Sequence, residues 1–231
     1  MQQKPSISPN NRILKGLSVA DMALLRPDLE PVSLPVRHVL EKPNKPIKHN
    51  YFIEYGLASI VAANKNKRLE VGLIGCEGVT GLPIILGKDM SPNENFMQVP
   101  GHGIRIAADK LRKAISQSRS LERALLSFAH AFMNQTANTT LANGTATLEE
   151  RLARWLLLAD DRLRGDEVPL THEFLSLMLG VRRAGVTVAL HYLEQRALIR
   201  LSRKQILITD RKGLRAAANG SYHEPEKPGK S

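Results

Sequence analysis

The sequence predicts an α+β fold in which antiparallel strands come first and helices follow. Three stretches carry this prediction: short strands between turn residues in 31–108, apolar side chains at helical spacing in 109–164, and two short helices with a basic β-hairpin in 165–215. Short strands with frequent turn signals favour an antiparallel barrel or sandwich. The 231 residues, 42% of them apolar, suit one large domain or two small ones.

The strands are marked by apolar side chains that alternate or cluster between turn residues. They follow a short helix that Ser18 is placed to cap. Five stretches share the pattern: Val32–Val36, Tyr51–Val61, Leu69–Leu73, Phe96–Val99 and Ile104–Ala107. Asn64–Lys67 is expected to be a hairpin loop, and the last two stretches are expected to form a strand pair. A tight turn region is expected at three glycines: Gly75, Gly78 and Gly81.

Helical spacing begins at Asp109, with apolar residues recurring at three, four and seven positions as far as Leu141. Asn143-Gly144 interrupts this pattern. Thr147 and Glu150 then have the spacing of a capping box, which predicts that another helix begins there. Core helices are more common than dimer helices, so the pattern alone leaves the role of the first helix open.

The composition bounds the partner and the compartment. The formal net charge of +11 favours a polyanionic partner, because phosphate contacts release condensed counterions, although many basic proteins bind no nucleic acid. The single cysteine, Cys76, excludes a disulfide within the chain and a cysteine-ligated zinc or iron–sulfur site. The first ten residues lack an apolar signal core and the apolar runs are short, so a cytoplasmic protein is expected.

No pattern of reactive residues indicates an enzyme. The sequence contains no evident Ser/His/Asp set, and Gly78–Gly81 is not a phosphate loop because no Gly-Lys-Ser/Thr follows it. Scattered histidines favour surface or core positions over ligand positions: His38, His49, His102 and His130. We therefore expect no catalytic residues, no metal and no cofactor. Cys76 could sense redox state if its pKa were lowered, but a buried, inert thiol is more common.

The segment from Leu170 to Glu194 has the pattern of two helices joined by a sharp turn. Thr171 is placed to cap the first helix, Gly180 ends it, and Val181 plugs the turn from its apolar side. The apolar residues of the second helix are spaced by four and three, so its opposite face stays polar.

The polar face of the second helix starts with Arg182 and Arg183 and continues to Thr187 and His191. Arginines at the start of such a helix suit guanine, whose O6 and N7 accept a bidentate pair. We therefore expect Arg183, Thr187 and His191 to read base edges and Arg182 to contact a phosphate.

Residues 197–208 predict two short strands around a basic turn. Such a wing places Arg203 and Lys204 against phosphates, and Thr171 is a further candidate for a phosphate contact. The alternative is an αα-hairpin packed in a core with its arginines solvated. The order of helix, glycine turn, helix and basic wing favours DNA binding.

These residues resemble the Crp/Fnr family of bacterial transcription regulators. The resemblance is strongest from Thr171 to Glu194, with the wing to Ile208, and extends to Tyr51–Gly56 and Leu69–Gly78. It implies a β-roll sensor domain with a cyclic-nucleotide-binding-like double-stranded β-helix in 11–141, including a dimer helix in about 109–141. It also implies a winged helix-turn-helix in 145–216, leaving 217–231 as a disordered tail.

The resemblance implies a homodimer on an inverted-repeat DNA site, one half-site per recognition helix. By position, Arg183 matches the main base-reading arginine and Thr171 matches a phosphate-contacting helix start. Arg182 stands where the family often has a serine, and Ala184 stands where better-known members carry a base-reading glutamate. The preferred DNA sequence should therefore differ from theirs.

The sensor segment departs from the family's cyclic-nucleotide site, which uses a Gly-Glu pair and a later arginine followed by serine or threonine. Here the turn is Gly78–Pro83, and no arginine lies between Arg68 and Arg105. A buried phosphate without a paired cation is costly, so neither cyclic AMP nor cyclic GMP is expected to bind. The segment Gly81–Met97 could line an apolar ligand pocket, although a loop that fills a vestigial pocket is the more common case.

Two other functions stay open at this stage. A non-specific basic nucleic-acid-binding protein would use the same net charge, and a ligand-binding scaffold without DNA affinity would leave Arg182, Arg183 and the wing unexplained. Activation of transcription would need a surface for RNA polymerase, and no motif identifies one. The effector, if there is one, is not indicated.

Overall fold

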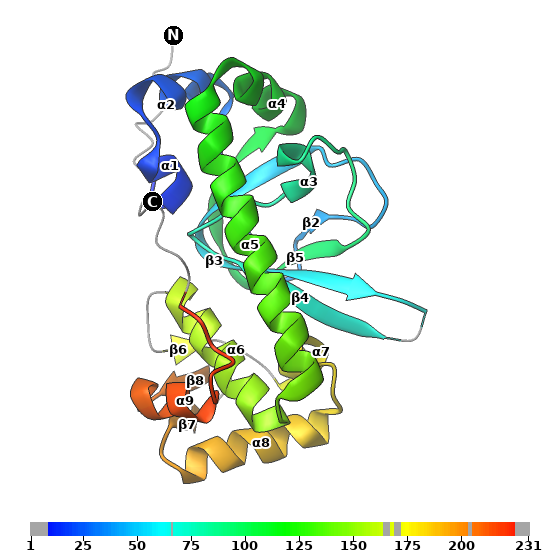
Figure 1. Ribbon diagram of the computed structural model, residues 1–231, viewed down its shortest axis with the longest axis vertical. Coiled ribbons are helices and arrows are strands. Elements are labelled where there is room, and N and C mark those ends of the chain that lie inside the picture. Colours follow the sequence, from blue (N-terminus) through cyan, green and yellow to red (C-terminus); the bar gives the residue numbers. More distant parts are fainter. Residues whose placement is uncertain (1–8, 66, 164–166, 169–171, 203–204, 225–231) are drawn as a thin grey trace.

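The computed structural model describes residues 9–65, 67–163, 167–168, 172–202 and 205–224, and it confirms the α+β class. Figure 1 shows two parts: a β-roll above and a helical domain below, with the long helix α5 running down the front of both. Helix α8, Arg183–Gln195, lies at the lower end of the molecule, away from the roll (Figure 1).

The β-roll is built from antiparallel strands in the order β1-β5-β3-β4, with β2 paired to β5. Their bounds are β1 Glu30–Leu34, β2 Val39–Glu41, β3 His49–Ala63, β4 Arg68–Ile74 and β5 Glu94–Ala107. The predicted strand pair at the end of the roll is wrong, because β5 is one continuous strand. Its Gly101 does not turn the chain: a Cβ there would lie 1.9 Å from the Tyr55 carbonyl oxygen, so the glycine permits close approach to β3.

Helices pack at the ends of the roll and along its side. Their bounds are α1 Arg12–Gly16, α2 Val19–Leu25, the 3-10 helix η1 Arg26–Asp28, α3 Leu82–Ile85, α4 Ala108–Gln117 and α5 Arg119–Thr145. Ser18 caps α2 as predicted, accepting from the Asp21 N–H at 3.0 Å. The sequence did not predict α1, whose cap, Asn11, is buried and donates to the carbonyl oxygens of Ile53 and Gly78.

The single helix expected from Asp109 to Leu141 is instead two helices. The chain leaves the helical conformation at Ser118 (φ −138°, ψ 114°), whose hydroxyl accepts from the Leu121 N–H and so caps α5. Asn143-Gly144 does not interrupt the pattern, because α5 continues through it to Thr145.

The C-terminal domain has three helices packed against a fourth and a small antiparallel sheet of order β6-β8-β7. The bounds are α6 Leu148–Leu163, β6 Glu167–Val168, α7 His172–Leu179, α8 Arg183–Gln195, β7 Ile199–Ser202, β8 Gln205–Ile208 and α9 Arg211–Ala217. The predicted capping box is confirmed: Thr147 N–H donates to Glu150 Oε2 (2.8 Å), and Glu150 N–H donates to Thr147 Oγ1 (3.3 Å). Among the described helices, none alone is long and apolar enough to cross a membrane; α7 and α8 meet that test only as a pair bent by 103°.

The prediction of a disordered tail from residue 217 is wrong as far as residue 224. Tyr222 is buried against the helical core, and its hydroxyl donates to Asp161 Oδ2 at 2.8 Å. The Ser221 carbonyl oxygen accepts from Arg154 Nε at 3.0 Å. Charged and polar composition suggested solvation, but one aromatic ring and these polar contacts hold the segment on α6. Residues 225–231 lie outside the described chain.

Helix α6 joins the two domains. Leu57, Val61 and Leu73 of the roll share one apolar cluster with the buried side of α6. Two polar contacts cross the same boundary: Trp155 Nε1 donates to Glu70 Oε1 (2.6 Å), and Arg162 Nε lies 2.7 Å from Glu77 Oε1. The roll and the helical domain are therefore tied together at the middle and at the C-terminal end of α6.

Glu70 is a carboxyl group removed from water at this boundary. Desolvation raises its pKa from 4.5 to about 7, and the hydrogen bond from Trp155 and the charge of Arg154 offset only part of that effect. The folded protein therefore binds a proton at Glu70 more tightly than the unfolded chain does. Stability from this group is fully present below pH 4.5 and is lost as the pH rises to about 7.

We predict that the free energy of unfolding falls by about 2–3 kcal/mol between pH 5 and pH 8 through Glu70 alone. The measurement is urea denaturation at both pH values for the wild type and for Glu70→Gln, which keeps an acceptor for Trp155 but cannot titrate. The variant should lack this part of the pH dependence. Equal pH dependence in the two proteins would show that Glu70 is ionised throughout the range.

Candidate nucleic-acid interface

Helices α7 and α8 meet at 103° across a three-residue turn, the geometry of a helix-turn-helix. Gly180 ends α7 in the left-handed region (φ +64°), and Val181 N–H bonds back to the Ser176 carbonyl oxygen at 3.0 Å. A Cβ on Gly180 would also lie 2.8 Å from Leu69 Cδ1 of β4. The left-handed backbone favours glycine at this turn, and the missing side chain also lets the turn lie close to Leu69 of the roll.

A single apolar core holds the two helices. The side chains that meet there are Leu175, Met178, Leu179, Val186, Ala189, Leu190 and Leu193, each at most 4% exposed. Val181 packs against this core as predicted, and Arg151 of α6 donates to the Leu179 carbonyl oxygen at the end of α7. Helix α8 therefore presents its remaining face outward from a rigid support.

Arg182 and Arg183 stand at the start of that outward face. Arg182 is the N-cap residue of α8, Arg183 is its first residue, and both are exposed. Neither side chain forms a hydrogen bond or ion pair with any described residue, unlike Arg37, Arg105 and Arg162, which are paired with carboxylates. Two unpaired guanidinium groups at one helix end are available for a polyanion.

Thr187 and His191 follow on the same helix, and each has a polar contact within the domain. The Thr187 hydroxyl donates to the Arg183 carbonyl oxygen (3.2 Å) and lies 3.1 Å from His172 Nδ1. His191 Nδ1 lies 3.4 Å from Glu194 Oε2. Thr187 would have to exchange these contacts to read a base through its hydroxyl, whereas His191 keeps Nε2 available and the Arg183 side chain has no contact with a described residue to give up.

The predicted β-wing follows α8. Strands β7 and β8 pair antiparallel, with Ser202 opposite Gln205 at the tip, and Glu194 Oε1 accepts the Leu201 N–H at 2.9 Å. That bond fixes the first wing strand to the recognition helix. Three predicted phosphate contacts, Thr171, Arg203 and Lys204, lie outside the described residues.

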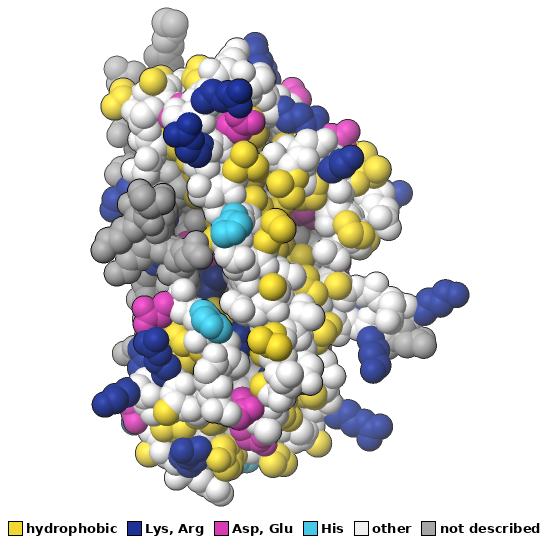
Figure 2. Space-filling view, viewed as in Figure 1, with side chains coloured by type: hydrophobic (Ala, Val, Ile, Leu, Met, Phe, Trp, Pro, Cys, Tyr) yellow, Lys and Arg dark blue, Asp and Glu magenta, His cyan; other side chains and the backbone are white. Residues whose placement is uncertain are grey.

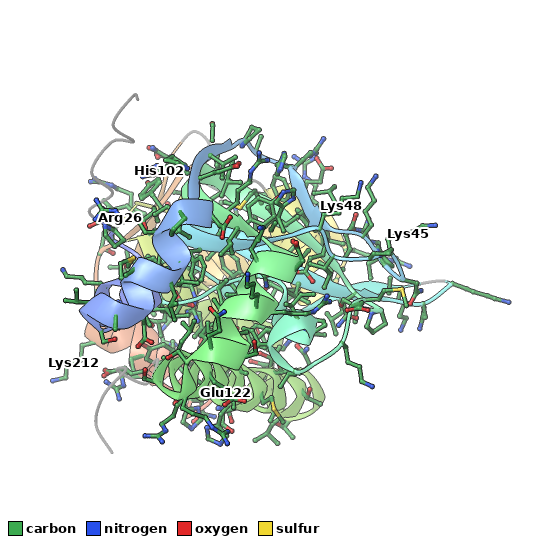
Figure 3. The ribbon with its side chains drawn as sticks, turned by 90° about the horizontal axis from the view of Figure 1, so that it is seen from above. Arg26, Lys45, Lys48, His102, Glu122 and Lys212 are labelled. Carbon is green, nitrogen blue, oxygen red and sulfur yellow. The ribbon has the colours of Figure 1, made fainter. Side chains whose placement is uncertain are left out.

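Sequence reasoning overlooked Tyr192 and Arg196 at the end of α8. Tyr192 is 44% exposed, and Arg196 lies over its ring (5.4 Å to the centroid) and donates to its hydroxyl at 3.0 Å. The i, i+4 spacing of these residues was a usable signal. Cations therefore flank α8 at both ends. Basic side chains elsewhere point outward on different sides of the molecule, as Arg26, Lys45, Lys48 and Lys212 do in Figure 3.

A cleft of about 1220 Å³ opens between α7 and the β3–β4 hairpin. Two of its arginines face acids: Arg37 lies 3.5 Å from Glu173 and Arg68 is paired with Glu94. The predicted ligand segment Gly81–Met97 supplies only Glu94 and Phe96 to this cleft.

Cys76 is buried, with Sγ 3.9 Å from the Arg162 carbonyl oxygen. The described residues hold no cluster of three metal-ligating side chains.

Comparison with known proteins agrees with this geometry. Residues 150–217 match the family model of the Crp-like helix-turn-helix domain. A search of curated proteins finds no match to the sequence. Among solved structures, the chain is similar to FixK2 from Bradyrhizobium japonicum, with 17% identity and a TM-score of 0.71 over 82% of this chain and 96% of that one.

Two further solved structures share the fold. A CRP-family transcriptional regulator from Thermus thermophilus has 16% identity and a TM-score of 0.68, covering 85% of this chain and 99% of that chain. The c-di-GMP-responsive global regulator CLP of Xanthomonas campestris has 15% identity and a TM-score of 0.66, covering 83% and 99%. At these identities the likeness concerns the fold.

The fold and the free face of α8 define a winged helix-turn-helix protein of the DNA-binding class. Residues 150–217 match the Crp-like helix-turn-helix domain model, and the chain shares the fold of solved Crp/Fnr-family transcription regulators over most of its length. The resemblance inferred from the sequence is confirmed at these two levels.

We predict that Arg183→Ala costs about 1–3 kcal/mol of binding free energy at the preferred DNA site and relaxes the preference at one base pair. The measurement is fluorescence anisotropy with the preferred site and its single-base variants. Arg182→Ala is the matched comparison: loss of a phosphate contact should weaken all sequences alike and reduce the salt slope by about 1. If Arg183→Ala behaves in the same uniform way, Arg183 contacts only phosphate.

Proposed function

We propose that the protein is a cytoplasmic transcription regulator that binds an inverted-repeat DNA site as a homodimer and is not controlled by cyclic nucleotides. The observation that carries the proposal is the pair of exposed, unpaired arginines at the start of α8, held outward by a buried helix-turn-helix core. Base edges in the major groove and the flanking phosphates are the natural partners of such a helix.

A row of side chains along α5 supports the homodimer. Exposed positions recur at a spacing of three and four: Leu126, His130, Met133, Ala137 and Leu141. Met133 and Leu141 are each 62% exposed, and Figure 2 shows hydrophobic side chains along the face that α5 covers. The opposite side of α5 is seated on the roll: Gln135 exchanges hydrogen bonds with Leu73, and Phe132 lies against Gly72. A second copy of the same helix would cover the outer row.

The interior of the roll supports the absence of cyclic-nucleotide control. Gly81 N–H, in the turn where the family holds its nucleotide, donates to Glu41 Oε1 at 2.8 Å, and Asn95 Nδ2 donates to the same oxygen. Asn50 Nδ2 donates to the carbonyl oxygens of Thr80 and Gly81. The Gly81 N–H, which could donate to a bound phosphate, therefore donates to the carboxyl group of Glu41 instead. Burial raises the pKa of this carboxyl group.

The test of the function is selection of bound genomic fragments by the purified protein at about 150 mM salt. Recovery of a two-fold inverted repeat, unchanged by added cyclic AMP or cyclic GMP, is the expected result. Fragments without a shared sequence would instead indicate a non-specific nucleic-acid-binding protein. Failure to retain DNA would leave a scaffold protein as the better description. A set that changes with a cyclic nucleotide would overturn the proposed independence from that ligand.

The homodimer is tested by Met133→Lys. Two such lysines would face each other across a two-fold axis along α5, so the dimer dissociation constant should rise at least about tenfold and binding to the inverted repeat should weaken. The control is Asn134→Lys, which adds the same charge about 100° further round the helix. Sedimentation velocity reports the mass of each variant. A wild-type monomer at micromolar concentration, or equal dissociation of both variants, would contradict this interface.

A further inference from the structure

The outward face of α8 can be defined by the residues opposite its buried side. Val186, Ala189, Leu190 and Leu193 are fully buried. At about 100° per residue, the direction opposite these four falls between His191 and Val188. Arg183 and Tyr192 lie at the two edges of the outward face, about 110° and 70° from its centre. Val188 is therefore closer to the centre of this face than the arginine expected to read a base.

Val188 is an apolar side chain that lies outside the apolar cores of the described chain. It is 66% exposed and belongs to none of the three apolar clusters of the described chain. A β-branched residue in a helix keeps essentially one χ1 rotamer, so its two methyl groups hold fixed positions relative to the helix axis. Such a fixed side chain suits a van der Waals contact with an apolar group at one defined position.

The surroundings of Val188 favour DNA over a protein as its partner. Ala184, one turn earlier on the same stripe, is exposed and short, so the centre of the face can approach a surface closely. Cations border this stripe at both ends: the unpaired Arg182 and Arg183 at the start of α8, and Arg196 beside Tyr192 at its end. An apolar strip between cations complements the floor of the major groove between its two phosphate backbones.

We propose that Val188 is a specificity-determining residue that contacts the 5-methyl group of a thymine in each half-site, an inference that rests on the proposed DNA-binding function. The thymine methyl is the apolar group that an unmodified base pair presents in the major groove, and cytosine lacks it. Val188 lies about 7.5 Å along the helix from Arg183, so the thymine should lie within about two base pairs of the base that Arg183 reads.

The experiment removes apolar groups from each partner in turn: deoxyuridine lacks the 5-methyl group of thymine, and Val188→Ala lacks the two γ-methyl groups of valine. In the preferred half-site each thymine is replaced in turn by deoxyuridine, which lacks only the 5-methyl group, and dissociation constants are measured for the wild type and Val188→Ala. At one thymine, deoxyuridine should weaken the wild type about three- to tenfold, as expected for apolar surface left in water. Val188→Ala should bind more weakly to the thymine site and should not respond to that replacement.

Two controls separate this contact from general weakening. Gln195→Ala lies on the same face further along α8 and should keep the wild-type response to deoxyuridine at that thymine. Placing 5-methylcytosine instead of cytosine at the same position should restore part of the wild-type affinity. Because Val188 is exposed, its replacement should leave the melting temperature unchanged, which circular dichroism checks.

The outcomes separate this inference from the function beneath it. A wild-type protein that binds no inverted repeat refutes the proposed function, and the role of Val188 falls with it. Specific binding in which the wild type and Val188→Ala respond equally to every deoxyuridine refutes the role of Val188 alone. Equal loss of the response in Gln195→Ala would also refute it, because the effect would then belong to the whole helix.

Discussion

The seating of α6 against the β-roll is the contact on which the rest of the structure depends. Trp155 contributes an apolar ring to the shared core and an N–H to the buried carboxyl group of Glu70. Removing either partner would leave a buried polar group without a hydrogen bond or would open a cavity, and both are costly. The contact therefore fixes the position of α6 against the roll. A second polar contact between α6 and the roll, the ion pair of Arg162 with Glu77, lies at the C-terminal end of α6. The arginine side chain there is 3% exposed.

Helix α6 also carries the DNA-binding elements. Arg151 holds the end of α7, Arg154 holds the chain after α9 and reaches Thr139 of α5 at 2.9 Å, and Arg211 of α9 pairs with Asp160 and Asp161. The direction of α8 relative to α5 is therefore supported mainly by contacts of one helix, with the contact of Gly180 and Leu69 beside it. In a dimer joined along α5, that direction sets the separation of the two recognition helices, and hence the half-site spacing. A signal that reached the roll could act on the helix-turn-helix through α6 or through the direct contact of Gly180 with Leu69.

Much of the site could be predicted because its signals are local. The Gly180 turn, the Thr147–Glu150 capping box and the apolar spacing within α8 each depend on residues no more than a few positions apart. Two of the predictions that failed depended on distant partners. Phe96–Val99 and Ile104–Ala107 were expected to be two paired strands because nothing in the sequence tells that Gly101 lies against Tyr55, and the chain near Tyr222 looked solvated because Asp161 is far away in sequence. Val188 was passed over because a valine in a helical pattern is normally assigned to the core.

The sequence by itself determined the class of fold, the helix-turn-helix and the positions of Arg182 and Arg183 at the start of the second helix, because periodicity, capping and turn chemistry act within a few residues. Only the tertiary structure decided which of the arginines stay unpaired and that Glu41 occupies the Gly81 amide. It also decided that a buried Glu70 joins the two domains. The residues in these contacts are 40 to 85 positions apart in the sequence. Local sequence patterns do not show which distant residues will meet, because that depends on how the whole core packs.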